Sequence, residues 1–455
     1  MSILSFEYLI FVCLFFGIFS FLKNKSKKYL ILIFSYLFYG SISPILLSAL
    51  ILSTLFNYFG NKIFLKNEIR WIIVSNISLL LVFKLNINLG TETVLVPIGI
   101  SFFTFQAIGY VIDRSRNQIT FSHSFIDFAN YLAFFPQLIS GPIEKFNSLG
   151  GQLAKSVKLS FKNIQEGLFL ILIGLCKKLI IADRCGVIVD SVYDHIHLSN
   201  GTSIVIATVL FYFQIFLDFS GFCNIAEGIS KLIGINLSPN FNKPYLSSSI
   251  SEYWRKWHIS LHKWFKEYLY SGLKTKMGWC FAAFLTFLIS GLWHGINITF
   301  LIWGIYCFLC LIFDKYIIQK YIKYNFLRVI SVALLIISSR IFYRSNSLED
   351  LSILFSKSTN WESLTPVLSD LFYILSNPFT SNFSGDFNIG MQKIEISHFD
   401  LIIMFSGLLF WGIITVVSMK INQKNTSKNL AIFCLSIILM VLGFNNDKPF
   451  IYLQF

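Results

Sequence analysis

Charged residues are scarce in this chain of 455 residues: 13% are Asp, Glu, Lys or Arg, against roughly 25% in soluble globular domains. Hydrophobic residues make up 55% of the chain, and 50 Phe, 20 Tyr and 9 Trp supply more apolar surface than a water-soluble fold covers. The composition therefore excludes a soluble globular protein. It predicts an all-α polytopic integral membrane protein.

Three motifs that carry common enzyme chemistry are also missing. The chain has no G-x-x-x-x-G-K-[ST] phosphate loop, no G-x-G-x-x-G after a strand and no G-x-S-x-G nucleophile elbow. ATP hydrolysis, hydride transfer and serine-esterase chemistry lose their usual support. The eight cysteines lie mostly in apolar runs, and the pair Cys307 and Cys310 has no second pair at zinc spacing, so neither a disulfide framework nor a metal site is predicted.

The net charge of +14 favours membrane anchoring over nucleic-acid binding, because the basic residues are spread through short segments and form no contiguous patch. Residues 3–22 form the first apolar stretch and are expected to stay in place as a first helix, since no basic region precedes them and no cleavage site follows. The run Lys23, Lys25, Lys27 and Lys28 comes directly after this helix. Positive residues beside a span stay in the cytoplasm, so the N-terminus is expected to face outward.

Apolar segments of spanning or near-spanning length recur along the chain, with no internal repeat and no linker between them. At about 20 residues per crossing they predict roughly ten to twelve transmembrane helices in a single domain, residues 1–455. Breaks inside some of them are tolerated only where protein or a water-filled cavity surrounds the chain. The segments are residues 3–22, 29–59, 71–89, 94–112, 126–143, 164–192, 203–235, 279–313, 326–343, 401–419 and 430–446.

Two stretches differ from these spans. Residues 345–400 are rich in Ser, Asn and Asp and predict an extramembrane loop with short helices. Residues 238–272 mix aromatic and cationic side chains too closely for a span, and apolar residues recur at helical spacing after an N-cap at Ser249 or Ser251. This pattern predicts an amphipathic helix that lies at the membrane interface or re-enters the bundle.

His294 is the first candidate for chemistry, because the twelve residues on either side of it contain no Lys, Arg, Asp or Glu. Burial favours the neutral imidazole, which is the form that accepts a proton from a hydroxyl. Gly291 and Gly295 leave room for another chain segment or a ligand. The alternative to a catalytic role is that His294 is a core residue whose imidazole forms a hydrogen bond with one neighbouring hydroxyl. Ionisable groups inside membrane proteins are nonetheless candidates for function.

His258 and His262 are four residues apart and are expected to share a helix face. A metal site there lacks support, because Ile259 stands where a zinc protease has Glu and no third ligand is evident. His258, beside Trp257, is the better candidate to face a cavity. Asp218 lies in an aromatic run and needs a partner if buried; packing, for example against Arg255 or a helix end, and contact with substrate both remain open.

The chain resembles the membrane-bound O-acyltransferases, specifically the bacterial branch with the membrane subunits of alginate and peptidoglycan O-acetylation. The segments that carry the resemblance occur in family order and cover nearly the whole chain. They are ISFFTFQAIGYVIDRSR (100–116), YLAFFPQLISGPIEKF (131–146), FLDFSGFCNIAEGI (216–229), NFNKPYLSSSISEYWRKWHISLHKWFKEYLY (240–270), SGLWHG (290–295) and PFIYLQF (449–455).

The resemblance implies a ring of transmembrane helices around a central tunnel in the bacterial cytoplasmic membrane. His294 matches the family's catalytic histidine and His258 its second active-site position. The resemblance implies that His294 acts as general base or forms an acyl-histidine, while His258 polarises the thioester carbonyl or orients the acceptor. Five further residues are expected to line the tunnel or touch substrate: Asp218, Asn242, Trp254, Trp257 and Trp293.

The implied reaction is O-acetylation of a cell-surface or exported polysaccharide, with acetyl-CoA as donor, no permanently bound cofactor and no metal. A separate extracytoplasmic partner of the serine-hydrolase type is implied, because this chain contains no such domain. Departures at Lys266, Glu267, residues 271–278 and Arg340 put alginate in doubt as the acceptor. Two alternatives remain: a D-alanyl transfer subunit for teichoic acid, and a transporter or exporter of a lipid-linked saccharide.

Overall fold

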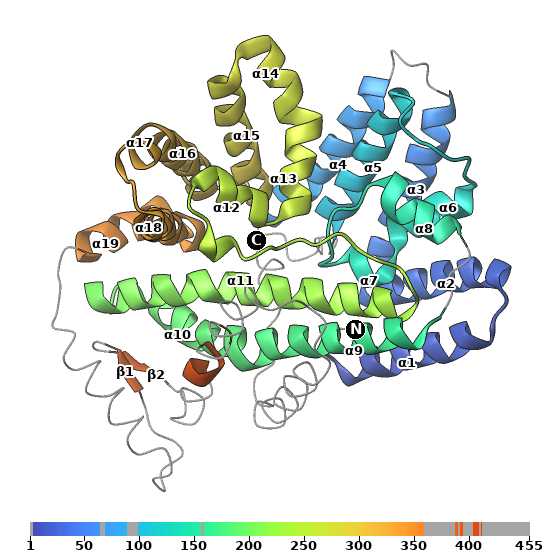
Figure 1. Ribbon diagram of the computed structural model, residues 1–455, viewed down its shortest axis with the longest axis horizontal. Helices are drawn as coiled ribbons and strands as arrows, with labels where there is room; N and C mark the ends of the chain where they lie inside the picture. Colours follow the sequence, from blue (N-terminus) through green and yellow to red (C-terminus); the bar gives the residue numbers. More distant parts are fainter. Residues whose placement is uncertain are drawn as a thin grey trace, which may run out of the picture. The chain divides into compact units, whose positions relative to one another are not determined.

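The computed structural model of the chain describes residues 3–63, 69–88, 99–155, 159–358, 387–389, 392–394, 404–408 and 411 (Figure 1). The chain forms two compact units, each assembled from several segments of the sequence. Unit 1 consists of Met1–Ile171, Cys223–Asn242 and Trp257–Ala282. Unit 2 consists of Leu172–Phe222, Lys243–Lys256 and Ala283–Phe455. A single membrane domain over residues 1–455 stays a prediction.

Unit 1 contains the N-terminal helices and the helices that follow His258. In it α2 packs against α3 and α6, and α4 packs against α5. Its helices are α1 (Phe6–Phe21), α2 (Asn24–Ile42), α3 (Pro44–Ile63), α4 (Ile69–Asn88), α5 (Ile100–Ser115), α6 (Phe125–Ala133), α7 (Phe135–Leu138), η1 (Phe146–Gly150), α8 (Gly151–Ala154), most of α9 (Phe161–Leu175), α13 (Ile259–Phe265), η4 (Lys266–Tyr270) and α14 (Ser271–Met277).

Unit 2 contains the helices around His294, and in it α16 packs against α18. Its strands pair antiparallel, with Phe387 opposite Ile394. The elements are η2 (Cys176–Ala182), α10 (Asp183–Asp194), most of α11 (Gly201–Leu232), η3 (Pro244–Leu246), α12 (Ile250–Lys256), most of α15 (Trp279–His294), α16 (Ile298–Phe313), η5 (Asp314–Ile318), α17 (Gln319–Tyr321), α18 (Asn325–Arg344), α19 (Leu348–Ser358), β1 (Phe387–Ile389) and β2 (Gln392–Ile394).

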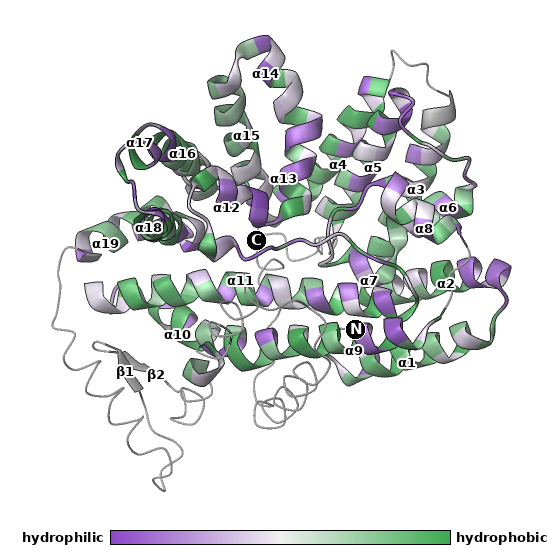
Figure 2. Ribbon diagram, in the orientation of Figure 1, coloured by the Kyte–Doolittle hydropathy of each residue, from purple (hydrophilic) through white to green (hydrophobic). Residues whose placement is uncertain are grey.

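Apolar helix faces exposed to the surroundings confirm that the chain is a membrane protein. Phe6, Leu9 and Leu14 on α1 are more than half exposed, as are Ile330 and Leu334 on α18. Figure 2 shows both helices as predominantly hydrophobic. Exposed apolar area of this extent indicates contact with lipid rather than water.

Three helices among the described residues are long and apolar enough to cross a membrane: Gly201–Leu232, Ile298–Tyr321 and Asn325–Arg344. Three shorter apolar helices, Phe6–Phe21, Pro44–Gly60 and Trp279–His294, add further candidates. The prediction of multiple spans is therefore confirmed. The total of ten to twelve stays a prediction, and the segments at 401–419 and 430–446 lie almost entirely outside the described residues.

Helices α15 and α16 cross at short distance in unit 2 because glycine removes the side chain from the contact. A Cβ atom added at Gly291 would lie 2.3 Å from the carbonyl oxygen of Phe300, and one at Gly304 would lie 2.6 Å from that of Phe287. Any side chain at either position would push the two helices apart. The close crossing places the end of α15, where His294 lies, directly beside the first turns of α16.

Three local predictions need correction. Residues 126–143 do not form one near-spanning helix, because α6 ends at Ala133 and Pro136 lies in the first turn of the separate helix α7. The amphipathic helix predicted in 238–272 is broken between α12 and α13 at His258, although Ser249 caps α12 as expected through its bond to the Glu252 amide. Residues 345–400 contain the short helix α19, as expected, but also the strand pair β1 and β2.

Candidate active site

His258, in unit 1, has an unusual backbone conformation. It precedes α13 with φ 42° and ψ 56°, in the left-handed region, and its residue surface is only 2% exposed. A residue other than glycine in this region costs of the order of 1–3 kcal/mol, and such strain persists where surrounding contacts over-determine it. The left-handed residue ends α12 and starts α13, so His258 faces inward instead of lying on a continuous helix with His262.

Asn240 supplies the contacts that hold this turn. Its side-chain Oδ1 accepts hydrogen bonds from the backbone amide of Ser260 at 3.2 Å and from the Ser260 hydroxyl at 2.9 Å. Its carbonyl oxygen accepts from the amide of Ile259 at 2.9 Å. His258 Nδ1 lies 3.1 Å from the same Asn240 Oδ1. One buried asparagine thus fixes the backbone and the imidazole together.

These bonds determine the tautomer of His258. Oδ1 of Asn240 is an acceptor, as the Ser260 amide shows, so Nδ1 of His258 must carry the proton and donate it. Burial lowers the pKa of His258 to about 3, so the ring is neutral at physiological pH. Nε2 then carries a lone pair. It is an acceptor, suited to a hydroxyl group and unsuited to a carbonyl oxygen.

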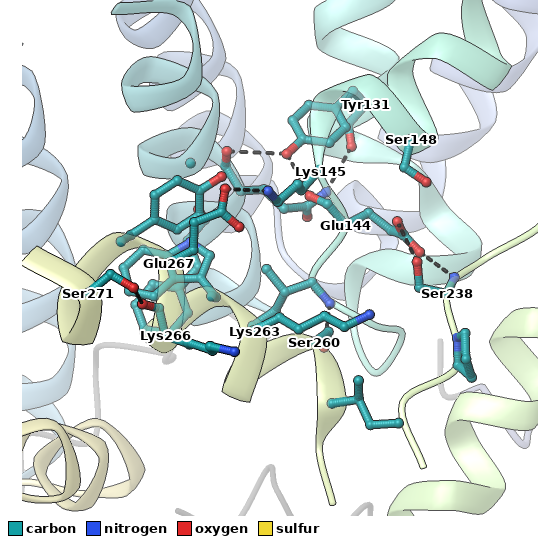
Figure 3. Close-up of a pocket in the computed structure, with 18 residues that line it drawn as sticks. Tyr131, Glu144, Lys145, Ser148, Ser238, Ser260, Lys263, Lys266, Glu267 and Ser271 are labelled. Carbon is teal, nitrogen blue, oxygen red and sulfur yellow. Dashed lines mark hydrogen bonds and ion pairs between the residues drawn. The ribbon is translucent and has the colours of Figure 1, made fainter. Parts of the chain in front are cut away.

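A pocket of about 580 Å³ lies beside this turn in unit 1 and is drawn in Figure 3. Ile259 and Ser260, the two residues after His258, form part of its wall. The remaining walls come from α5, from α6, from the segment that follows α7, from the residues just before Asn240, and from α13, η4 and α14. Aromatic rings form one side: Phe105 stacks on Trp264 with centroids 4.2 Å apart.

Charged side chains surround this pocket (Figure 3). Lys145 forms an ion pair with Glu267 at 2.5 Å, and Glu144 accepts hydrogen bonds from the amide and hydroxyl of Ser238. Burial raises the pKa of Glu144. Lys263 and Lys266 are exposed on the pocket wall and form no ion pair within the described part of the chain.

His294, in unit 2, lies at the C-terminal end of α15 and is 8% exposed. Its Nδ1 lies 3.2 Å from the hydroxyl oxygen of Tyr343 on α18. Aromatic rings lie close to it: the centroids of Trp293, Trp303 and Tyr343 lie 4.7, 5.1 and 5.2 Å from that of His294. A core histidine without a catalytic role would need a neighbouring hydroxyl as hydrogen-bond partner, and the Tyr343 hydroxyl is such a group. A general base also needs a partner that orients its ring, and the same hydroxyl can serve as that partner.

Asp218 is held by an ion pair that the sequence did not indicate. Lys178 Nζ lies 2.7 Å from Asp218 and 2.7 Å from Asp183, and all three side chains are at most 3% exposed. Lys178 and Asp183 lie at the point where α9, η2 and α10 join. Lys178 is thus the partner found for Asp218, and the suggested packing against Arg255 or a helix end stays a prediction. The ion pair accounts for the burial of Asp218, and contact with substrate stays a prediction.

The other predicted residues divide between the two units. Asn242 is exposed, and Trp257 is buried against Phe241, with ring centroids 5.2 Å apart in an edge-on arrangement. In unit 2, Trp293 touches His294, and Trp254 joins the same cluster through Trp303, whose centroid is 6.0 Å away. No cluster of metal-binding side chains occurs among the residues the structure describes.

Four important residues escaped the sequence-based prediction: Asn240, Lys178, Trp303 and Tyr343. Each acts through a contact with a residue far away in the sequence. Asn240 offered one signal, since N-F-N places two asparagines at 240 and 242, but the spacing does not tell which of them turns inward.

Comparison with known proteins identifies the family. Residues 31–336, well over half of the chain, match the model of the membrane-bound O-acyltransferase family. The chain is 32% identical over 370 residues to the probable alginate O-acetylase AlgI of Pseudomonas syringae pv. tomato, covering 74% of this chain and 71% of that protein. It is 36% identical over 281 residues to the peptidoglycan O-acetyltransferase of Helicobacter pylori, covering 52% of this chain and 53% of that protein.

A third relative is more distant. The teichoic acid D-alanyltransferase of Streptococcus thermophilus is 27% identical over 234 residues, covering 48% of this chain and 56% of that protein. The matches thus span about half the length of two of the three relatives. The family match removes the basis for the transporter alternative. The chain belongs to the membrane-bound O-acyltransferase family and is an O-acyltransferase related to bacterial polysaccharide O-acetylases.

Proposed function

We propose that this chain transfers an acetyl group from acetyl-CoA across the bacterial cytoplasmic membrane for O-acetylation of a surface or exported polysaccharide. The observation that carries the proposal is the buried His294, whose Nδ1 lies 3.2 Å from the Tyr343 hydroxyl, in a chain of the O-acyltransferase family. Similarity to O-acetylases named for alginate and for peptidoglycan supports acetyl as the acyl group and a glycan as the acceptor.

His294 is the proposed general base. When its Nδ1–H donates to the Tyr343 oxygen, Nε2 carries the lone pair that takes the proton of the attacking hydroxyl. The surrounding aromatic rings limit the access of water to the imidazole. Base catalysis of this kind contributes about 10²- to 10⁴-fold to the rate.

His258 is proposed to orient the acceptor. Its Nδ1–H is engaged by Asn240, so Nε2 presents a lone pair that can accept a hydrogen bond from a hydroxyl. This tautomer favours the orienting role over polarisation of the thioester carbonyl, which would require an N–H donor at Nε2. The left-handed backbone and the Asn240 contacts keep the ring in one orientation, as positioning of a reactant requires.

The pocket of Figure 3 is proposed to bind the anionic part of the acyl donor. Coenzyme A carries several negative phosphate oxygens, and Lys263 and Lys266 offer ammonium groups on the pocket wall. The stacked Phe105 and Trp264 provide an apolar surface beside them. No cofactor is proposed to stay bound between turnovers.

The wider architecture is proposed from the family. It consists of ten to twelve transmembrane helices in a ring around a central tunnel, in the bacterial cytoplasmic membrane. Delivery to the polysaccharide is proposed to use a separate extracytoplasmic acyltransferase of the serine-hydrolase type. Genetic loss of glycan acetylation on deletion of such a secreted protein tests this partner.

The main alternative to this proposal is D-alanyl transfer to teichoic acid, the activity for which the more distant relatives are named. The identity of the acyl donor distinguishes the two functions. Membranes containing the chain are incubated with labelled acetyl-CoA or with a labelled D-alanyl carrier protein. We expect label transfer from acetyl-CoA that depends on His294. Transfer from the carrier protein alone would replace acetyl with D-alanyl as the group carried.

A further inference from the structure

Two buried indole N–H groups stand out in the aromatic cluster around His294. Nε1 of Trp303 and Nε1 of Trp254 are both inaccessible to water, and neither has a hydrogen-bond acceptor among the residues that the structure describes. Trp303 is 2% exposed. A buried donor without an acceptor destabilises the fold, and native proteins contain few of them. Two such donors on neighbouring rings need an explanation.

The positions of these rings suggest what the donors are for. Trp303 lies edge-on to His294, at 88° with centroids 5.1 Å apart, and Trp254 lies edge-on to Trp303, at 83° with centroids 6.0 Å apart. Trp303 belongs to α16 and Trp254 to α12, so two different helices each contribute an indole to one cluster. A contact between an indole N–H and a neighbouring ring is weak and recovers only a small part of the cost.

The chemistry of acyl transfer lacks a donor at this point. Attack on a thioester places negative charge on the carbonyl oxygen, which needs preorganised N–H or O–H donors in a water-excluded site. His258 is the acceptor tautomer at Nε2, because Asn240 engages its Nδ1–H. Neither proposed role of the two histidines therefore supplies a donor for this oxygen.

We propose that Trp303 and Trp254 form the oxyanion-binding donors of this enzyme. The inference rests on the proposed acyl transfer. The acceptor hydroxyl oxygen bonds to the thioester carbonyl carbon while its proton passes to Nε2 of His294, and the carbonyl electron pair moves onto oxygen, where the indole N–H groups hold it. The oxyanion then reforms the carbonyl, the C–S bond breaks, and the imidazolium returns its proton to the leaving thiolate.

The test removes the N–H without changing the shape of the side chain. Trp303 is replaced by 3-benzothienylalanine, in which sulfur takes the place of the indole N–H, in the full-length chain purified in detergent. We expect kcat for acetyl transfer from acetyl-CoA to fall about 10- to 100-fold while KM changes less than about threefold. The same replacement of Trp254 is expected to lower kcat by about tenfold, because its ring joins the His294 cluster through Trp303.

Tyr306→Phe serves as the matched control. Tyr306 lies one turn from Trp303 on α16 and bonds to the Ser338 hydroxyl at 2.6 Å, so its loss affects packing without removing a proposed donor. We expect this variant to keep kcat within about twofold. Thermal unfolding of all variants is measured in parallel, and Trp303→Phe provides a second way of removing the N–H.

A benzothienylalanine variant at 303 with the kcat of the parent chain would overturn the inference, and so would a loss confined to KM. The proposed function would survive either result as long as His294→Ala abolished transfer. Full transfer by His294→Ala would instead overturn the proposed function itself.

Discussion

The two histidines are held in place by different physical means. His258 is fixed by its backbone: a left-handed residue and an asparagine that bonds to the ring and to the next two residues. His294 is held by aromatic rings and one tyrosine hydroxyl, at the end of a regular helix. The polar network determines a single tautomer for His258, whereas the Tyr343 hydroxyl can pair with either tautomer of His294. This difference supports the proposed positioning role of His258 and the proposed proton-transfer role of His294.

The largest effect is expected from His294→Ala. Removal of the proposed base should lower kcat by about 10²- to 10⁴-fold, because no other group is proposed to take the proton. Initial rates with labelled acetyl-CoA and purified protein measure the effect, and unchanged thermal unfolding serves as the control. If His294→Ala kept a turnover number close to that of the parent chain, His294 would not be the base, and the proposed difference in role between His294 and His258 would be contradicted.

Substitutions at His258 test the role of its backbone. His258→Asn should keep the fold, because asparagine tolerates the left-handed region and retains a polar side chain, and should lower kcat by about tenfold. His258→Val should lower the free energy of unfolding by about 1–3 kcal/mol more, since a β-branched residue is strained at φ 42°. Thermal unfolding of both variants provides the measurement. Equal stability of the two would contradict the backbone role.

Tyr343→Phe removes the hydroxyl that lies 3.2 Å from His294 Nδ1 and keeps the ring. We expect kcat to fall about tenfold with little change in KM, because the base loses its orienting partner but stays in the cluster. Phe342→Leu, at the neighbouring position on α18, is the control for packing. If Tyr343→Phe lowered stability without affecting kcat, the hydroxyl would have a structural role only.

The stability of the fold should depend on pH through His258. Because burial lowers the pKa of His258 from the ordinary 6.5 to about 3, the unfolded chain binds a proton that the folded chain does not between these values. Stability is therefore complete above pH 6.5 and falls as the pH is lowered toward 3, by about 2 kcal/mol at pH 5. Unfolding of the parent chain and His258→Asn at pH 8 and pH 5 measures this loss. An equal loss in both would contradict the burial of a neutral ring.

The smallest effect is expected at the pocket of Figure 3. Lys263→Ala and Lys266→Ala should each raise KM for acetyl-CoA by about two- to fivefold and leave kcat unchanged, because exposed ammonium groups interact weakly through water. The dependence of KM on salt should also become less steep. Lys274→Ala, on α14, is a control with the same charge change outside the pocket lining. An unchanged KM for acetyl-CoA in the variant that carries both Lys263→Ala and Lys266→Ala would contradict a role of the pocket in binding the donor.

Much of this organisation was predictable from the sequence. Scarce charge and long apolar segments predicted a helical membrane protein. The motif around His294 predicted a buried histidine in aromatic surroundings. These features depend on composition and on patterns among residues that are close together in the chain. Hydrophobic periodicity detects such local patterns.

The break at His258 and the partners of the site residues could not be predicted in this way. The apolar spacing of residues 254–269 continues across His258 as if through one helix, so only the contacts from Asn240 reveal the left-handed turn. Tyr343 and Lys178 lie about 50 and 40 residues from the side chains they hold, at distances where spacing carries no information.

Mass spectrometry of surface glycans most directly tests whether His294 carries acetyl transfer to a polysaccharide. Cells that lack the gene are complemented with the parent chain or with His294→Ala at equal membrane levels. We predict that the acetyl mass on the glycan disappears on deletion, returns with the parent chain and stays absent with the variant. Glycans that keep their acetyl groups without the gene, or regain them with His294→Ala, would contradict the proposed function.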